Sequence, residues 1–153
     1  MTTGPLLWID NDALNYFCKA HCLDKVLRNA PYRFATTAFV QMEAVKGVQA
    51  GVHDLQDAIY SMQHGDIVVH DTDVPPLDRL LEPQSGLGLS DESLALCASY
   101  HGGKVLTNDA GLIRYLKKNN IGCMTFRDFL VEAEANGWLD KDVVEGLKRL
   151  AML

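Results

Sequence analysis

Hydrophobic and polar positions along the chain alternate between two patterns. Residues 6–9, 67–70 and 104–107 are short, largely apolar runs, and residues 67–70 are rich in β-branched residues, as buried strands are. Other stretches follow the period of an amphipathic helix instead, and Leu14, Phe17, Cys18 and His21 stand at i, i+3, i+4 and i+7 of such a stripe. Strands that alternate with helices predict an α/β fold, with a mostly parallel sheet and helices on both of its faces.

Turn residues divide these patterns into separate elements. The strands are expected at residues 6–10, 32–35, 67–70, 104–107 and 121–125. The helices are expected at residues 12–18, 23–29, 53–63, 77–81, 109–118, 127–136 and 140–150. Two longer helices are expected to reach Gln49 from a cap at Thr36 or Thr37, and His101 from a cap at Ser90. Loops are expected at residues 71–76 and 83–89.

The length and composition are those of one ordinary globular domain. The chain has 153 residues, of which 48% are hydrophobic and 22% charged. Its apolar runs are too short to span a bilayer, and no basic region precedes the first of them, which argues against a signal peptide. The four cysteines follow no disulfide-scaffold spacing. These features predict a cytoplasmic protein without a membrane partner and with reduced thiols.

The formal net charge of −6 argues against one class of nucleic-acid-binding protein. A protein with this charge does not hold nucleic acid by bulk electrostatic attraction alone. A nucleic-acid enzyme is still compatible with it, because part of the negative charge could belong to a site that binds divalent cations. Bound cations reverse the local field.

Acidic residues stand where two of the apolar runs end. Asp10 follows the first run directly, and Asp109 follows residues 104–107 through Asn108. The carboxyl ends of parallel strands are where α/β folds bind their ligands. Glu43 and Asp91 lie in helix-like stretches between these two acids. Carboxylates that meet from such distant parts of a chain repel one another unless protons or metal ions intervene.

Each acid also has an ordinary structural interpretation when it is taken alone. Asp10 and Asp109 could cap the helices that follow them. Asp91 and Glu92 stand in a first helical turn, where the helix dipole favours acids. Glu43 could be a rim residue of an apolar helix. Only the order of the acids along the chain and their surroundings point to a common site.

That order resembles the PIN-domain family of metal-dependent nucleases. The segment Leu7-Trp8-Ile9-Asp10-Asn11-Asp12-Ala13-Leu14 is similar to the opening motif of the family. Leu106-Thr107-Asn108-Asp109 is similar to its closing motif, and Val40 with Glu43 matches its internal helix. The resemblance extends to about Leu130 and is closest to the compact prokaryotic members, many of which are ribonuclease toxins of toxin–antitoxin pairs.

The resemblance implies a three-layer α/β/α PIN-like domain with a core of about residues 1–130 and a C-terminal helical extension at residues 131–153. It implies a hydrolase that holds Mg²⁺ or Mn²⁺ with carboxylates and cleaves single-stranded or structured RNA by a metal-activated water. An antitoxin protein and a second copy of the chain are the partners that it suggests besides RNA.

It also implies roles for particular residues. Asp10 and Asp109 would be the main metal ligands, Asp91 would bind a second ion directly or through water, and Glu43 would orient water. Glu92 follows Asp91 directly, which leaves open which of the two acids contributes.

Further residues would support the site or bind the substrate. Asp12, Glu92, Asn108 and Thr107 are supporting candidates, although Thr107 could equally be a plain strand-end hydroxyl. The candidates for contact with RNA are Arg33, Lys46, Arg114, Lys117 and Lys118. A solvated helix face is the simpler interpretation of the last three.

Two alternatives remain open. Asp10 and Asp12 also resemble the Asp-x-Asp motif of haloacid-dehalogenase-like phosphatases, in which the first Asp is the nucleophile and the second the acid. That interpretation leaves Glu43 unexplained, finds no convincing later Lys or metal motif, and meets Ala13 where those enzymes usually have Thr or Val. The second alternative is a non-catalytic PIN-like module that binds nucleic acid or protein.

Overall fold

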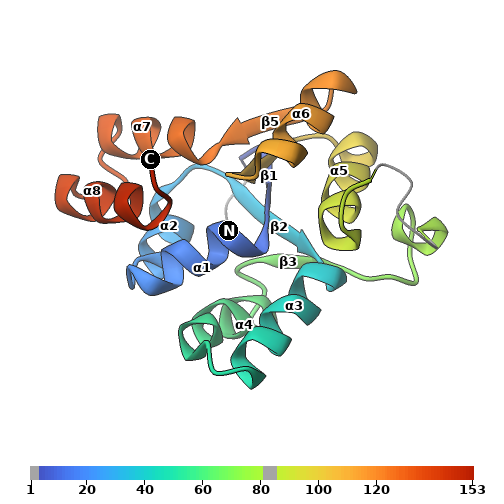
Figure 1. Ribbon diagram of the computed structural model, residues 1–153, viewed down its shortest axis with the longest axis horizontal. Coiled ribbons are helices and arrows are strands. Elements are labelled where there is room, and N and C mark those ends of the chain that lie inside the picture. Colours follow the sequence, from blue (N-terminus) through green and yellow to red (C-terminus); the bar gives the residue numbers. More distant parts are fainter. Residues whose placement is uncertain (1–3, 81–85) are drawn as a thin grey trace.

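A five-stranded parallel sheet forms the centre of the molecule, with helices on both of its faces (Figure 1). The computed structural model describes residues 4–80 and 86–153. The strands lie in the order β3-β2-β1-β4-β5. Their bounds are β1 (Leu6–Ile9), β2 (Arg33–Thr37), β3 (Val68–His70), β4 (Lys104–Thr107) and β5 (Gly122–Thr125). The predicted α/β class is therefore confirmed, and every strand pairing of the sheet is parallel.

The helices follow the predicted segments closely. Those between β1 and β3 are α1 (Asn11–Lys19), α2 (Leu23–Asn29), α3 (Ala38–Gln49), η1 (His53–Leu55) and α4 (Gln56–Gln63). Those after β3 are η2 (Leu77–Arg79), α5 (Leu89–His101), α6 (Ala110–Lys118), α7 (Phe126–Ala135) and α8 (Lys141–Leu150).

Apart from shifts of one residue, β2 ends at Thr37 where the prediction ended at residue 35, and three helical segments differ in type or in their start. The helix expected at residues 53–63 begins with the 3₁₀ turn η1, and the one expected at 77–81 is the 3₁₀ turn η2. Residues 81 and 83–85, the ends of that helix and of the following loop, lie outside the described residues. Helix α5 begins at Leu89 with Gly88 as its N-cap, so the predicted cap at Ser90 is wrong. The extended backbone at Gly88 starts the helix two residues earlier.

The strand order contains a reversal between β1 and β4. The chain moves outward from β1 through β2 to β3, then returns to place β4 on the other side of β1 and continues to β5. Right-handed crossovers with this order put α1 to α4 on one face and α5 and α6 on the other, as Figure 1 shows. In open parallel sheets ligands bind at the carboxyl ends of the strands beside such a reversal.

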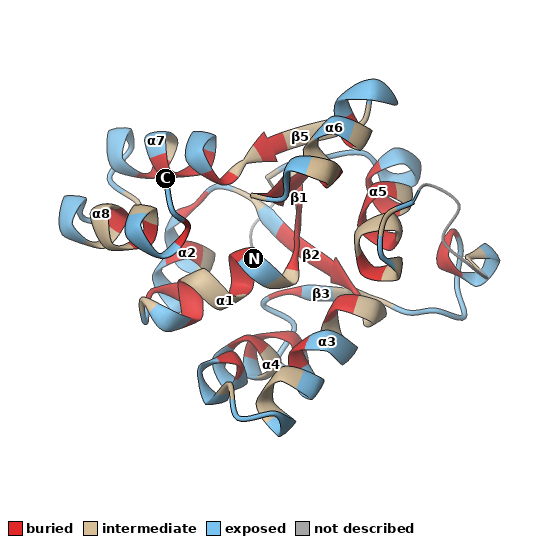
Figure 2. Ribbon diagram, in the orientation of Figure 1, coloured by how far each residue is buried: buried red, intermediate tan, exposed pale blue. Residues whose placement is uncertain are grey.

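The C-terminal helices belong to the same hydrophobic core as the rest of the chain. Phe126 and Phe129 of α7 pack against Phe17 of α1, with ring centroids 5.3 and 5.4 Å apart. Val144 and Leu147 of α8 are buried. Figure 2 shows buried positions on the strands and on helices of both faces, those of α7 and α8 included. Residues 131–153 are thus packed onto the domain.

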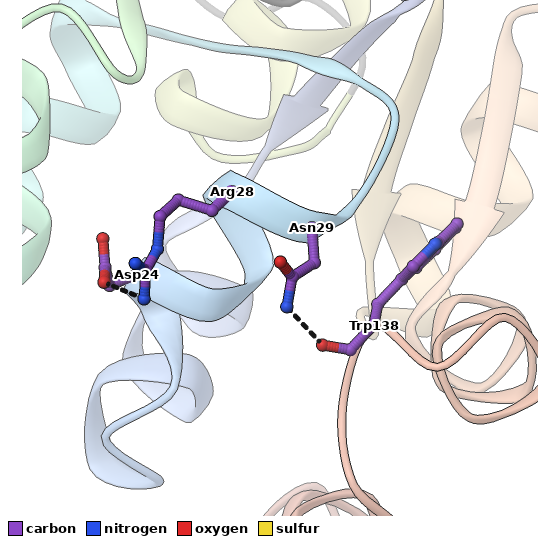
Figure 3. Close-up of polar contacts among 4 residues, drawn as sticks. All are labelled: Asp24, Arg28, Asn29 and Trp138. Atoms are coloured by element: carbon purple, nitrogen blue, oxygen red, sulfur yellow. Dashed lines mark hydrogen bonds and ion pairs between the residues drawn. The ribbon is translucent and has the colours of Figure 1, made fainter.

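A polar contact joins the connection between α7 and α8 to the end of α2. The side-chain amide of Asn29, at the end of α2, donates to the carbonyl oxygen of Trp138 at 3.0 Å (Figure 3). The neighbouring Asp24–Arg28 ion pair, at 2.7 Å, bridges one turn of α2. The Trp138 ring meets Tyr32 edge-on with centroids 5.8 Å apart. The contacts of Asn29 and Tyr32 with Trp138 hold the connection between α7 and α8 against the end of α2 and the residues that follow it.

The remaining expectations concern the thiols and the membrane. All four cysteines are free, and Cys18, Cys22 and Cys97 are buried. Burial raises the pKa of the Cys18 and Cys97 thiols to about 12. Among the helices in the described part of the chain, none combines the length and apolar character that crossing a bilayer requires.

Candidate active site

Asp10 and Asp109 lie at the carboxyl ends of the two strands that flank the reversal. Asp10 follows β1 and is the N-cap of α1, and its Oδ1 accepts a hydrogen bond from the backbone N–H of Ala13 at 2.8 Å. Asp109 follows β4 and caps α6 in the same way, through Leu112 at 2.9 Å. Both carboxylates therefore serve as caps. Each keeps further lone pairs for another partner.

Thr107, the last residue of β4, connects these two acids. Its hydroxyl donates to Oδ2 of Asp10 at 2.6 Å and accepts from the backbone N–H of Asp109 at 3.0 Å. The side chain of Thr107 is fully buried. The threonine thus fixes the spacing of the two strand ends, which is more than a plain strand-end hydroxyl does.

A cavity of about 150 Å³ opens beside Asp10. Its walls come from three separate parts of the chain, namely the start of α1, the middle of α3 and the start of α5. The residues that line it are Asp10, Asn11, Asp12, Val40, Glu43, Gly88, Ser90 and Asp91. Four of the predicted acids therefore meet at one cavity.

Hydroxyl groups hold α3 against α5 at this cavity. The Ser90 hydroxyl donates to Oε1 of Glu43. Ser93 donates to the carbonyl oxygen of Ser90 at 2.6 Å and shares a hydrogen bond of 2.8 Å with the hydroxyl of Thr37, the N-cap of α3. Glu43 is exposed, yet Ser90 orients it at the cavity wall.

The acids raise one another's pKa values. Burial raises the pKa of Asp10 to about 7, against the opposing hydrogen bonds from Thr107 and Ala13, and the charges of Asp12 and Asp91 add to the rise. Asp10 is only 3% exposed. Buried carboxylates that face like charges resist ionisation, and either a proton or a cation relieves the conflict.

Asp91 experiences the same conflict and brings Asp109 into the group. Burial raises the pKa of Asp91 to about 6, followed by the negative charges of Asp109, Glu43 and Asp12. Asp109 does not line the cavity, but its charge acts on a residue that does. The structure thus gathers the acids into one electrostatic cluster.

The donors of this cluster fit a hard divalent cation in chemical type. Carboxylate and amide oxygens are the ligands that Mg²⁺ and Ca²⁺ take in proteins. Asn11 is part of the cavity wall, and its Oδ1 is buried and has no hydrogen-bond partner, so one neutral oxygen is free as well. Within residues 4–80 and 86–153, no three His, Cys, Asp or Glu side chains are already arranged around a single ion position. A cation at this cavity would therefore require side-chain adjustment or further oxygen donors.

The predicted supporting residues differ in where they point. Glu92 lines a separate cavity of about 640 Å³ together with Tyr100 and Tyr115, whereas its neighbour Asp91 lines the acidic one. Asn108 donates through its side-chain amide to the carbonyl oxygen of Ala151 at 3.2 Å. That contact ties the closing motif to the end of α8.

Arg114, one of the basic candidates, lies close to Asp109. A Cβ atom added at Gly111 would lie 3.2 Å from Oδ1 of Asp109 and 3.9 Å from a terminal guanidinium nitrogen of Arg114, so both side chains flank the same glycine. Lys117 and Lys118 are exposed at the far end of the same helix.

The predicted position of Arg33 near the acids is wrong. Arg33 is the first residue of β2 and pairs with Leu6, the first residue of β1, so it lies at the amino ends of the strands. The acids follow the carboxyl ends of the strands, at the opposite edge of the sheet. The Arg33 side chain instead donates to the carbonyl oxygen of Gly4 at 2.9 Å. Lys46 is exposed in the last turn of α3.

Two polar residues at the cavity had no functional role in the sequence interpretation. Ser90 was assigned to helix capping, and Asn11 appeared only within the opening motif. The signal for Ser90 is its place one turn before Leu94, on the side of α5 that faces the core. Nothing local identifies Asn11, because its free oxygen depends on how α1 packs.

A similar fold occurs in a solved structure, the crystal structure of PAE2754 from Pyrobaculum aerophilum. The two chains share 21% sequence identity, and the match covers 87% of this chain and 99% of that one with a TM-score of 0.60. This likeness shows the fold alone. No protein-family model matches the chain, and no curated protein matches it.

Proposed function

We propose that this protein is a divalent-metal-dependent endoribonuclease of the PIN type. The observation that carries the proposal is the meeting of Asp10, Asp12, Glu43 and Asp91 at one cavity, beside the reversal in strand order. Burial and mutual repulsion leave Asp10 with a pKa of about 7. A site whose carboxylates repel one another is stabilised when a cation binds there.

Bound Mg²⁺ or Mn²⁺ would supply a Lewis acid and a water of lowered pKa for attack on a phosphodiester. Asp10, Asp91 and Asp109 are the residues that we assign to holding the cation. Thr107 keeps Asp10 and Asp109 at a fixed spacing through its two hydrogen bonds. Glu43, which accepts a hydrogen bond from Ser90, is the residue that we assign to orienting a water in the cavity.

RNA would approach the acids from the side of α6. Arg114 lies beside Asp109 across Gly111 and is exposed, so its guanidinium group can reach a phosphate near the carboxylates. The net charge of −6 does not oppose this, because a filled cation site reverses the local field.

The biological setting rests on the resemblance of the motifs alone. We propose a cytoplasmic ribonuclease that acts as the toxin of a toxin–antitoxin pair, with a small antitoxin protein as its inhibitor and a second copy of the chain as a further partner. A neighbouring gene that encodes a small DNA-binding protein is the observation that would support this assignment.

Cleavage of labelled single-stranded RNA tests the catalytic proposal. The parent protein is expected to cleave with Mn²⁺ or Mg²⁺ and to stop when EDTA is added. Asp10→Asn and Asp109→Asn are expected to lower the rate by about 100-fold or more, because each removes a charge that faces the reacting group. Asp71→Asn, a change in an exposed loop, serves as the matched control.

Three results would contradict the proposal. Variants at Asp10 and Asp109 that cleave as fast as the parent would show that these acids do not form the site. Covalent phosphorylation of Asp10 by a phosphoester, with RNA left intact, would favour the phosphatase. Metal binding without cleavage of any RNA would favour the non-catalytic module.

A further inference from the structure

Two buried side-chain atoms in the described residues have no hydrogen-bond partner, and both are amide oxygens of α1. They are Oδ1 of Asn11 and Oδ1 of Asn15. The two residues are four positions apart, so they lie on the same side of the helix, one turn from each other. A buried acceptor without a partner is rare in folded proteins, and a bound ion or ordered water is a frequent explanation.

The surroundings of the two amides differ. Asn11 is part of the wall of the acidic cavity, whereas Asn15 is not. The cavity of about 150 Å³ has room for a cation together with several waters, since one water occupies about 30 Å³ of liquid. Asn11, whose Oδ1 has no hydrogen-bond partner, therefore belongs to the wall of a space where an oxygen donor has something to bind.

Because the cavity is already strongly negative, a neutral amide oxygen is a more favourable additional ligand than another carboxylate. The other strong donors in the wall are the carboxylates of Asp10, Asp12, Glu43 and Asp91, and their mutual repulsion already raises pKa values. Another carboxylate would add to that repulsion. An amide carbonyl adds a ligand without adding charge, and cation sites in proteins use Asn in this way.

We propose that Asn11 is a ligand of the divalent cation and binds it through Oδ1. The centre then has a neutral oxygen donor beside its carboxylates. The inference rests on the proposed metal dependence, but it concerns the binding of the ion and not the cleavage of RNA.

Titration of Mn²⁺ alone into the full-length protein tests the inference, with binding followed by calorimetry and by the electron paramagnetic resonance of free Mn²⁺. Asn11→Ala is expected to raise the Kd for Mn²⁺ by about tenfold or more, since even residues that only orient ligands change metal affinity by 10- to 100-fold. Asn15→Ala is the matched control, because it removes the same group from the same helix outside the cavity, and its Kd is expected to stay within about twofold of the parent.

Stability without metal separates a ligand from a structural residue. Both substitutions replace a side chain whose amide oxygen is buried and without a partner by the best helix former, so neither variant is expected to have a lower Tm than the parent in EDTA. Asn11→Asp keeps an oxygen at the position and is expected to bind Mn²⁺ more tightly than Asn11→Ala.

The outcomes distinguish this inference from the proposed function. If the parent binds Mn²⁺ and Asn11→Ala binds it equally well, the inference is wrong and the proposed function stands. Equal weakening by Asn11→Ala and Asn15→Ala would also overturn it, because the effect would then come from α1 as a whole. A parent protein that does not bind Mn²⁺ would refute the proposed function itself.

Discussion

Asp10→Asn is expected to change the pH dependence of stability in a way that only a buried, destabilised carboxylate produces. Asn has nearly the same shape as Asp but does not ionise in this range. In the metal-free parent, the pKa of Asp10 rises from 3.8 to about 7 because the side chain is buried among other acids. Its contribution to stability is therefore fully present below about pH 4 and is lost as the pH rises through 7.

The size of the effect follows from the two pKa values. A difference between 3.8 and about 7 corresponds to about 4 kcal/mol of unfolding free energy at 1.36 kcal/mol for each pKa unit. Asp10 is only 3% exposed, so solvent screening reduces this figure little. For a domain of this size, that is a change in Tm of about 10 °C.

Urea unfolding in EDTA at several pH values measures the difference between parent and variant. Relative to the parent, Asp10→Asn is expected to gain about 4 kcal/mol between pH 4 and pH 8. Groups that titrate in both proteins largely cancel in this difference. Asp71→Asn, whose side chain is exposed, is expected to give a flat difference.

Added Mn²⁺ should reverse the order of stability at pH 8. The cation stabilises the parent, whose carboxylate it binds, and stabilises Asp10→Asn much less. A difference that does not change with pH in EDTA would show that Asp10 is ionised in the native state without strain. The electrostatic argument for a cation site at this cavity would then fail.

Two further predictions concern the neighbours of the acids. Thr107→Val removes the hydroxyl that joins Asp10 to Asp109, and the unfolding free energy in urea is expected to fall by about 1–3 kcal/mol, more at pH 8 than at pH 4. Thr107→Ser keeps a hydroxyl and should retain most of the stability that Thr107→Val loses. Equal losses in both variants would contradict the role of the hydroxyl. Arg114→Ala is expected to reduce the slope of log RNA affinity against log salt concentration by about 1, while Lys118→Ala leaves it unchanged. Equal slopes for both variants would refute the placement of a phosphate beside Asp109.

The sequence predicts the elements of this fold well because their signals are local. Helix Leu23–Asn29 and strand Lys104–Thr107 have the predicted bounds. Strand β4 contains the β-branched residues Val105 and Thr107 and follows two glycines, and α5 ends at those glycines, which have φ values of +86° and +90°. Such patterns act within a few residues, so they need no knowledge of the rest of the chain.

The site was harder to predict because its contacts are distant in sequence. Thr107 meets Asp10 across 97 positions, and Ser90 meets Glu43 across 47. The choice between Asp91 and Glu92 depends on how α5 is rotated against the sheet, since neighbouring residues on a helix point about 100° apart.

Arg33 illustrates an error that topology could have prevented. The residue was predicted inside the second strand, near its beginning, and the beginning of a parallel strand lies at the end of the sheet away from the acids. Its positive charge alone suggested a place near the carboxylates. Position along a strand is therefore better evidence for a site residue than residue type.

The most direct test of the central claim compares two adjacent acids in one RNA-cleavage assay with Mn²⁺. Asp91 lines the acidic cavity and Glu92 lines another, although they are neighbours in the same helical turn. Asp91→Asn is expected to lower the cleavage rate by about 100-fold, and Glu92→Gln is expected to cleave within a few-fold of the parent. Full activity of Asp91→Asn, or equal losses in both variants, would contradict a nuclease centre built on this cavity.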